Sequence, residues 1–481
     1  MNRRQWMNRS GFLGLGLGLP SLPAWAQSQG ISPEMQVLSL YMSQASQKNL
    51  PEDVAQATKF HILDTLAAIV SGSKLLPGEA AFRYIQRFSG QGARTVMASR
   101  LSASTVDAAL ANGVMGHADE TDDSHGRSRS HPGCAVIPAA FAAGEEFNVS
   151  GTHFMRSVAL GYDVGTRVMM AMGGPKFSYT SHKSSHSIAG VFGAAAAAGC
   201  AANLNLQQMR WLLDYTSQQS SGIAAWGRDV DHIEKAFVFG GMPARSGTLS
   251  ALLVKAGWTG ISDVFSGADN FFQAYAPDVN RELITDKLGE RFEIVQTDIK
   301  KWSVGSPIQG PLDAIALIQQ RRPFQADQVE KISVRLEPSV SKVVNNRDMP
   351  DVCLQHMVAV MLLDKTASFK AAHDVPRMKN PEVLQIRERI ELIADVALTE
   401  FLPVRVAVVE VSLKSGELLT ERVDAVRGTP RNPMTQAEVF AKAQDLLGPV
   451  LGLAKSKRLI QAIDSLEKID SIRKLAPLLH A

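Results

Sequence analysis

The sequence of 481 residues predicts a mostly α-helical protein, in which a large all-helical domain carries an inserted, smaller α+β lid domain. Two changes of pattern along the chain predict this division. Between residues 32 and 289 the apolar side chains recur with a period close to 3.6, whereas after Phe292 they alternate with polar ones and are often β-branched. Helical spacing returns after Thr435. The expected segments are a leader (1–26), the helical domain (27–290), the α+β lid (291–430) and C-terminal helices that pack on the helical domain (431–481).

The helical domain is expected to consist of consecutive amphipathic helices. The first of them opens with Pro51, Glu52 and Asp53, a composition typical of a first helical turn. Another, SIAGVFGAAAAAGCAA, has small residues almost throughout and would let helix backbones approach closely. The expected helices cover residues 51–71, 103–118, 138–147, 152–172, 187–202 and 243–257.

The expected lid combines strands with helices. Its strands are predicted at residues 293–302 (EIVQTDIKKW), from Lys331 (KISVRLEP) and from Val404, where Ser415 and Gly416 supply a hairpin turn. Two helical patterns lie between them, at residues 311–320 and 352–364. Because the chain returns to the helical domain afterwards, we expect a ligand-binding cleft between the two lobes.

The first 26 residues resemble an export signal. Arg3 and Arg4 precede a short, glycine-rich apolar stretch, GFLGLGLGLP, which is followed by the cleavage pattern Ala24, Trp25, Ala26. Paired arginines favour the twin-arginine route, so we expect a mature, soluble periplasmic protein that starts at Gln27. The alternative is an uncleaved, disordered leader.

Composition excludes several classes of function. The net charge is +3 and no run of Lys and Arg exceeds two residues, so nothing indicates nucleic-acid binding. Cys134, Cys200 and Cys353 are far apart and lack a C-x-x-C spacing, which argues against a disulfide framework or an iron–sulfur centre. We expect three buried, unreactive thiols.

One segment, HADETDDSHGRSRSHP at residues 117–132, holds three histidines, three aspartates and a glutamate. Apolar runs flank it on both sides, so the loop emerges from the interior of the protein. Titratable groups at this density belong to a solvated loop or to a site where they tune one another's pKa values. We interpret this loop as a site.

The motifs NGVMGHADETDDSH and HPGCAVIPAA resemble the signature of the MmgE/PrpD family, which includes 2-methylcitrate dehydratase and cis-aconitate decarboxylase. The resemblance continues, in order, through GVFGAAAAAG, PARSGTLSALLVKAGWTG, LEPSVSK, CLQHMVAVMLLD and VRGTPRNPMT, and so covers essentially the whole mature chain. It implies homodimeric lyases and related enzymes that act on small di- and tricarboxylates without a cofactor or a metal. It also implies the fold expected above.

The resemblance assigns roles to individual residues. The acid of the family's active site falls at Glu120, where most members have aspartate, and its hydroxyl donor falls at Ser124 in place of threonine. The strongly expected histidine falls at His131, and the catalytic or substrate-binding lysines fall at Lys235 and Lys300.

Two positions depart from the family pattern. A second active-site histidine does not align cleanly, because Ser184 takes its place while His182 and His186 flank it. The tyrosine of some members is His356 here. Both departures concern the particular substrate and reaction rather than the fold.

The chemistry needs the same kinds of residue. Elimination of water or carbon dioxide from a polycarboxylate requires a base, an acid and cations that hold carboxylates, and histidine is the most available base near pH 7. The predicted catalytic residues are His131, Glu120, Ser124, Lys300 and His186, and the predicted substrate-binding residues are Lys235, Arg245, Asp122 and His356.

Less specific roles compete with these. Asp122 and Asp123 have the position of helix caps, and only one of the adjacent Lys300 and Lys301 can enter a cleft. Arg127 and Arg129 are expected to be surface charges.

Other functions remain open alternatives. Within the family, these are an epimerase or isomerase, or a decarboxylase, of a related dicarboxylate. Outside it, they are a periplasmic carboxylate-binding protein without activity and a metal-dependent hydratase or hydrolase. The metal would use His117, Asp119, Asp122, His125 and His131, although their spacing fits no standard helix-borne motif. Export favours an environmental polycarboxylate as the substrate.

Overall fold

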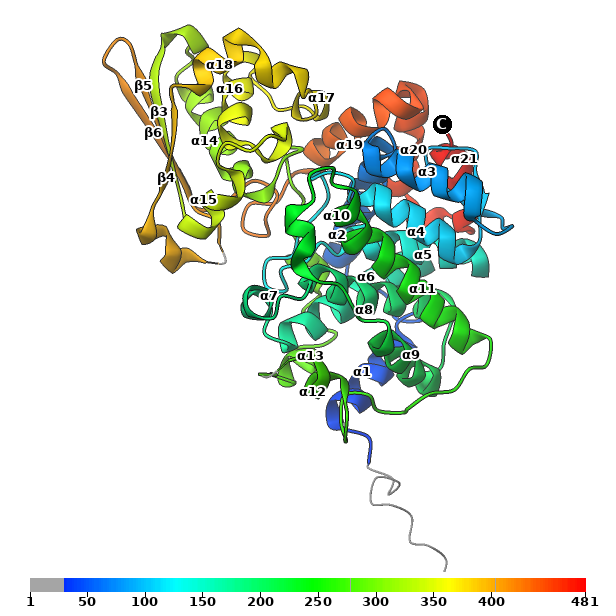
Figure 1. Cartoon of the computed structure of the whole chain (residues 1–481). Coiled ribbons are helices and arrows are strands. Elements are labelled where there is room, and N and C mark those ends of the chain that lie inside the picture. Colours follow the sequence, from blue (N-terminus) through cyan, green and yellow to red (C-terminus); the bar gives the residue numbers. More distant parts are fainter. Residues whose placement is uncertain (1–29, 277, 403) are drawn as a thin grey trace, which may run out of the picture.

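A computed structural model describes residues 30–276, 278–402 and 404–481. The expected leader lies outside these residues. The described chain is mostly α-helical, as predicted, and its apolar residues form two main buried clusters. The larger cluster draws on residues 35–299 and 434–479, and the smaller one on residues 302–426, which we call the smaller unit (Figure 1). That the smaller unit acts as a lid stays a prediction.

The large unit is built from helices that bury one face or, in the centre, all faces. Its first helices are α1 (Pro33–Gln44), α2 (Glu52–Gly72), α3 (Leu76–Phe88), α4 (Thr105–Gly116), α5 (Gly133–Phe147) and α6 (Gly151–Ala171). They are followed by α7 (Pro175–Thr180), α8 (Ser185–Ala201), α9 (Leu206–Gln218), α10 (Ile233–Ala236), α11 (Met242–Lys255), α12 (Phe271–Tyr275) and α13 (Glu282–Thr285). The pair β1 (Arg94–Thr95) and β2 (Ser102–Ala103) forms a minor antiparallel ribbon.

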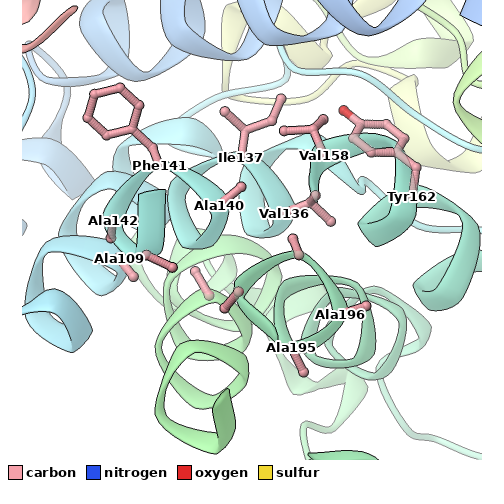
Figure 2. Packing of buried hydrophobic residues seen from close by; sticks show 14 of the residues in the cluster. Ala109, Val136, Ile137, Ala140, Phe141, Ala142, Val158, Tyr162, Ala195 and Ala196 are labelled. Atoms are coloured by element: carbon pink, nitrogen blue, oxygen red, sulfur yellow. The ribbon is translucent and has the colours of Figure 1, made fainter. Parts of the chain in front are cut away.

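Small side chains set the distance between the central helices. Every residue of α8 is buried, and α8 packs between α5, α6 and α11. At Gly161 of α6 an added Cβ would lie 2.8 Å from the carbonyl oxygen of Gly193 in α8, so only glycine permits this approach. Figure 2 shows the resulting layer, in which Val136 and Ile137 of α5 face Val158 and Tyr162 of α6.

The smaller unit contains a four-stranded sheet with helices packed against it. The strand order is β4-β3-β5-β6, with β3 and β4 parallel and the other pairs antiparallel. Its strands are β3 (Val329–Leu336), β4 (Ile390–Ala394), β5 (Ala407–Leu413) and β6 (Leu418–Val423). Its helices are α14 (Ser306–Arg321), α15 (Pro338–Val344), α16 (Leu354–Asp364), α17 (Phe369–Ala372) and α18 (Pro381–Arg387).

The predicted strand at residues 293–302 is wrong. The segment Glu293–Gln296 is a short 3-10 helix, and Asp298 forms only an isolated bridge with Ser124 of the loop 117–132. Glu293 and Lys300 are both buried, and each makes ionic contacts rather than lining a sheet face. This segment therefore leads into the site.

The C-terminal helices α19 (Gln436–Leu451), α20 (Leu453–Asp464) and α21 (Ala476–Leu479) join the core of the large unit. They lie beside the N-terminal helices in Figure 1, and α19 packs along α2. Lys442 of α19 lies 2.6 Å from Asp64 of α2 and donates to the carbonyl oxygen of Thr121 at 3.0 Å. The last helices thus contact the loop 117–132 directly.

The three cysteines are free thiols and buried, as predicted. Among the helices that the structure describes, none combines the length and the hydropathy needed to cross a membrane.

Candidate active site

The loop 117–132 connects α4 to α5, and most of its residues are buried. His117, Asp119, Glu120 and Asp122 are each at most 7% exposed. Burial of so many titratable groups is unfavourable unless they are paired. The loop is therefore not a solvated surface loop, and its charged groups need ionic or hydrogen-bond partners within the protein.

Asp122 lies at the centre of these contacts. One carboxylate oxygen lies 2.9 Å from Nδ1 of His117, and the other lies 3.2 Å from Nδ1 of His131 and 3.6 Å from Nζ of Lys300. Burial would raise the pKa of Asp122, but the two histidines and Lys300 outweigh it and hold that pKa well below its usual range. An ionised carboxylate only accepts hydrogen bonds, so each ring donates its Nδ1–H to Asp122, and the Nε2 nitrogen is the one that can carry a lone pair in the neutral ring.

Four histidines form a row through the site. The ring centroids are 5.3 Å apart between His232 and His117, 4.9 Å between His117 and His131, and 5.2 Å between His131 and His186. Phe239 lies against the row, stacked on His186 at 3.8 Å and on His117 at 4.4 Å. Burial in this setting, together with neighbouring cationic groups, lowers the pKa values of His232 and His186 well below the usual range.

Backbone packing brings the aromatic ring into place. Phe239 belongs to a π-helical turn, Phe237–Gly241, between α10 and α11. An added Cβ at Gly240 would lie 2.0 Å from the carbonyl oxygen of Gly113 in α4, so this turn approaches α4 as only glycine allows. The turn thereby positions Phe239 beside His117, the residue that caps α4.

Glu120 is held between two lysines. Lys235 of α10 forms an ion pair with its carboxylate, and Nζ of Lys300 lies 3.9 Å from the other oxygen. Lys300 also donates to the backbone carbonyl of Glu120 at 2.7 Å. Burial opposes ionisation of Glu120, but the two ammonium groups hold its pKa well below the usual range. In this arrangement Glu120 is a carboxylate that orients cations rather than a proton donor.

Asp123 stabilises the loop rather than lining the site. Its carboxylate accepts from the backbone N–H of Gly133, the first residue of α5, at 3.0 Å. It also contacts Nδ1 of His61 at 2.9 Å and the hydroxyl of Tyr162 at 2.5 Å. Asp123 therefore satisfies a free N–H at the helix start, the role weighed for it from the sequence.

The second half of the loop is mainly structural. Nδ1 of His125 lies 2.8 Å from the hydroxyl of Ser128, and its Nε2 lies 3.3 Å from Glu293. Arg127 is exposed, as predicted, but Arg129 is half-buried and lies over the ring of Tyr179 at 3.9 Å. Arg129 is thus not a simple surface charge.

The other residues predicted for the site lie in different surroundings. Ser124 is 9% exposed and pairs through its backbone with Asp298. His186 enters the row of histidines, whereas His182 is exposed. Lys300 points into the cluster, whereas Nζ of Lys301 lies over the ring of Trp302 at 4.4 Å.

Two predicted substrate-binding residues are not brought to the cluster. Arg245 is exposed on α11, on a helix face that points to solvent, and no ion pair among the described residues joins it to the loop. The motif PARSG suggested a site role for Arg245, but its side chain is exposed, whereas the preceding Pro243 and Ala244 are buried. His356 lies fully buried in α16 of the smaller unit, where burial and Arg387 lower its pKa to about 4.

The smaller unit reaches the site through other residues. Nε2 of His373, which caps α17, lies 3.0 Å from Asp119 of the loop. This contact and the nearby Asp351 raise the pKa of His373 to about 9 against the effect of burial. Asp351 is itself buried, and burial, with Glu120 and Asp119 nearby, raises its pKa to about 7.

Sequence reasoning missed His232, Phe239, Asp351 and His373. His232 could have been found, because it precedes Lys235 by three residues in DHIEKAF. Phe239 is an apolar residue shortly after Lys235, and Asp351 and His373 lie more than 200 residues after the loop, outside the motifs that indicated the site. Only the fold brings them to the loop.

The cluster combines imidazole nitrogens with one buried ammonium group, that of Lys300, and one part-buried ammonium group, that of Lys235. His117 and His131 present Nε2 as proton acceptors, and Lys235 and Lys300 supply positive charge for an anionic ligand. Such a set can remove a proton next to a carboxylate and stabilise the charge that develops.

The chain is similar to several known proteins. A cis-aconitate decarboxylase of Aspergillus terreus (strain NIH 2624 / FGSC A1156) is 23% identical over 476 residues, which cover 92% of this chain and 94% of that protein. The human cis-aconitate decarboxylase is 25% identical over 454 residues, 90% and 91% of the two chains. The cis-aconitate decarboxylase-like protein oryM of Aspergillus oryzae is 27% identical over 329 residues, 64% and 66% of the two chains.

Two family models match the chain in order. The MmgE/PrpD N-terminal domain matches residues 36–283, and the MmgE/PrpD C-terminal domain matches residues 302–468. Together they span both apolar clusters and the loop 117–132. The chain therefore belongs to the MmgE/PrpD family, whose similar members named above are lyases.

Proposed function

We propose that this protein is a lyase that removes water from a small di- or tricarboxylate, in the manner of a 2-methylcitrate dehydratase, and that it uses only its own side chains. The observation that carries the proposal is Asp122, which orients two imidazoles while Lys300 lies next to the same carboxylate. A candidate base with a fixed ring orientation and a cation therefore lie next to the same carboxylate.

The base is assigned to His131. Its Nδ1 faces Asp122, so the Nε2 lone pair is free, and its side chain keeps 11% exposure while that of His117 has none. A positioned base contributes roughly 10² to 10⁴ in rate. His131 would take the proton from the carbon next to a carboxylate.

Lys235 and Lys300 are assigned to bind the carboxylates of the substrate. Lys235 and Lys300 share Glu120 between them, so a substrate carboxylate can replace Glu120 as the partner of either ammonium group. Ammonium groups in a water-poor site stabilise the enolate-like charge that forms after proton removal. His186, whose ring lies 5.2 Å from that of His131, would take over the proton that His131 removes from the carbon and deliver it to the departing hydroxyl, which leaves as water.

Loss of carbon dioxide is the second candidate, because the relatives described above carry the name cis-aconitate decarboxylase. The same cations would hold the carboxylates that remain, and a histidine would protonate the carbon that loses carbon dioxide. Epimerisation needs only proton removal and return, and remains a third outcome of the same assay.

The test is NMR of the purified protein in D₂O with citrate, 2-methylcitrate, cis-aconitate and substituted succinates. Loss of water, loss of carbon dioxide and simple deuterium exchange give different spectra. We expect water loss, and we expect His131→Asn and Lys300→Met each to lower kcat by at least roughly tenfold. His182→Asn and Lys301→Met are the matched controls and should retain activity.

Two results would contradict the proposal. Near-normal kcat in both His131→Asn and Lys300→Met would remove the site assignment. Binding of a carboxylate without turnover over the whole panel would instead support a binding protein.

Export and dimerisation are further proposals. The leader motif with Arg3 and Arg4 supports transport by the twin-arginine route, which Arg3→Lys/Arg4→Lys should block in a fractionation experiment. The homodimer is implied by the family and can be measured by light scattering.

A further inference from the structure

A group of three potential ligands lies at one end of the histidine row. His117, Glu120 and His232 are all buried, and each offers a ligand atom within 4.8 Å of the other two. Two imidazoles and one carboxylate are the protein ligands of a common type of zinc site. The three residues come from the loop 117–132 and from the start of α10.

Both imidazoles have a nitrogen without a partner. Nε2 of His117 and Nε2 of His232 are buried and form no hydrogen bond within the described chain. A buried polar atom without a partner is unfavourable by about 1–3 kcal/mol. A single group that accepts lone pairs, such as a metal ion, would remove this cost at both nitrogens.

The surroundings of His117 are those of a metal-bound histidine. Its other nitrogen, Nδ1, faces the carboxylate of Asp122 at 2.9 Å. Metal-ligating histidines almost always donate this second N–H to a carboxylate or a carbonyl, which fixes the tautomer and orients the ring. Asp122 therefore prepares Nε2 of His117 as a ligand.

We propose that His117, His232 and Glu120 bind a divalent cation of the zinc type, with Asp122 as the carboxylate that orients His117. Imidazole ligands favour Zn²⁺ and Co²⁺ over Mg²⁺ and Ca²⁺, which prefer oxygen. This inference goes beyond the proposed function, and it differs from the ligand set that the sequence suggested, since only His117 is common to both.

The neighbouring group His117, Asp122 and Cys134 is a poorer site. Burial and the carboxylates nearby hold the pKa of the Cys134 thiol well above its usual range, so the thiol keeps its proton. Asp122 is already shared between two histidines and Lys300.

Lys235 must leave Glu120 before a cation can bind there. Its ammonium group already lies 5.7 Å from the ring of Trp226 and 5.4 Å from that of Phe239, so aromatic faces are available to it. The ion would thus occupy Glu120 and separate it from Lys235. Because the proposed lyase needs Lys235 for substrate, we infer that the cation inhibits the reaction reversibly.

The test is a titration of the full chain, first treated with a chelator, with Co²⁺ followed by its visible absorption and with Zn²⁺ in equilibrium dialysis. We expect one ion per chain with the spectrum of a four- or five-coordinate site. His232→Ala should weaken binding by at least roughly 100-fold, and Asp122→Asn by about 10- to 100-fold. The exposed His182→Ala is the matched control.

A second variant separates ligation from structural damage. Lys235→Met removes the cation that competes for Glu120, so it should strengthen Co²⁺ binding, whereas a merely structural role predicts no gain. Circular dichroism checks that each variant is folded, and His232→Gln replaces His232→Ala where folding fails. Absence of binding, or binding that neither His232 variant nor Lys235→Met changes, would overturn the proposal.

Activity distinguishes this inference from the proposed function. Lyase activity that survives chelation and falls when Zn²⁺ is added supports both. Activity that needs the ion would overturn the metal-free lyase while the site itself stands. Binding with no effect on turnover would overturn the inferred inhibition.

Discussion

The ion pair between His373 and Asp119 gives a sharp prediction, because it joins the smaller unit to the loop of the site. Nε2 of His373 lies 3.0 Å from the Asp119 carboxylate, and the pKa of His373 is raised from 6.5 to about 9. Asp119→Asn removes the charge but keeps the shape. Burial is then opposed only by Asp351 and by the hydrogen bond to the carbonyl of Phe369, so the pKa of His373 should fall well below 9.

The magnitude follows from the shift. One pKa unit corresponds to about 1.4 kcal/mol, so the shift from 6.5 to about 9 corresponds to about 3 kcal/mol. Since the folded-state pKa of His373 is raised, this stabilisation is fully present below pH 6.5 and is lost as the pH rises through 9. At high pH the neutral ring leaves Asp119 without its cation, and the attachment of α17 to the loop weakens.

Histidine NMR measures the prediction directly. The ring signal of His373 is assigned from its absence in His373→Gln, and its titration is followed in the native chain and in Asp119→Asn. Asp374→Asn is the matched control, because its carboxylate accepts from the backbone N–H of Arg377 rather than contacting the ring. A native pKa near 6.5, or one that Asp119→Asn leaves unchanged, would refute the reasoning.

Two further predictions concern stability. Asp123→Ala leaves His61, Tyr162 and the start of α5 without their acceptor. This change should lower the free energy of unfolding by about 3 to 5 kcal/mol, measured by calorimetry or urea unfolding. A loss below about 1 kcal/mol would contradict this role. Lys442→Met leaves the buried Asp64 unpaired and should lower the free energy of unfolding by about 3 to 5 kcal/mol. The additional change Asp64→Asn should restore much of that stability. An equal loss of stability in the single and double variants would contradict the pairing.

The helices could be predicted because burial leaves a periodic mark on the sequence. The segments α2 and α6 are rich in apolar residues and are buried on all sides over most of their length, and each begins after a residue typical of a helix start, Pro51 and Ser150. The β5–β6 hairpin was equally readable, since alternate residues of β5 are buried and Gly416 adopts a positive φ of 86° in the turn. The strand β4 was missed because only Ile390 of its five residues is buried, which leaves no alternation.

The site could be predicted where the loop itself carries the chemistry. His131, Glu120, Asp122, Lys235 and Lys300 are in mutual contact, directly or through one another. The separation of His186 from His182 could not be predicted, because both are next to the same helix and only the backbone of that turn decides which ring is buried. The placement of Arg245 failed for the same reason, since a motif does not show which face of α11 is covered.

The contact between Lys442 and the loop 117–132 has a consequence for biosynthesis. Asp64 and the carbonyl of Thr121 receive their cation from α19, more than 300 residues later in the chain. Most of the polypeptide must therefore leave the ribosome before this loop has all its partners. A nascent or truncated chain that lacks α19 leaves the loop 117–132 without these contacts, so we expect the proposed activity to arise only when synthesis is nearly finished.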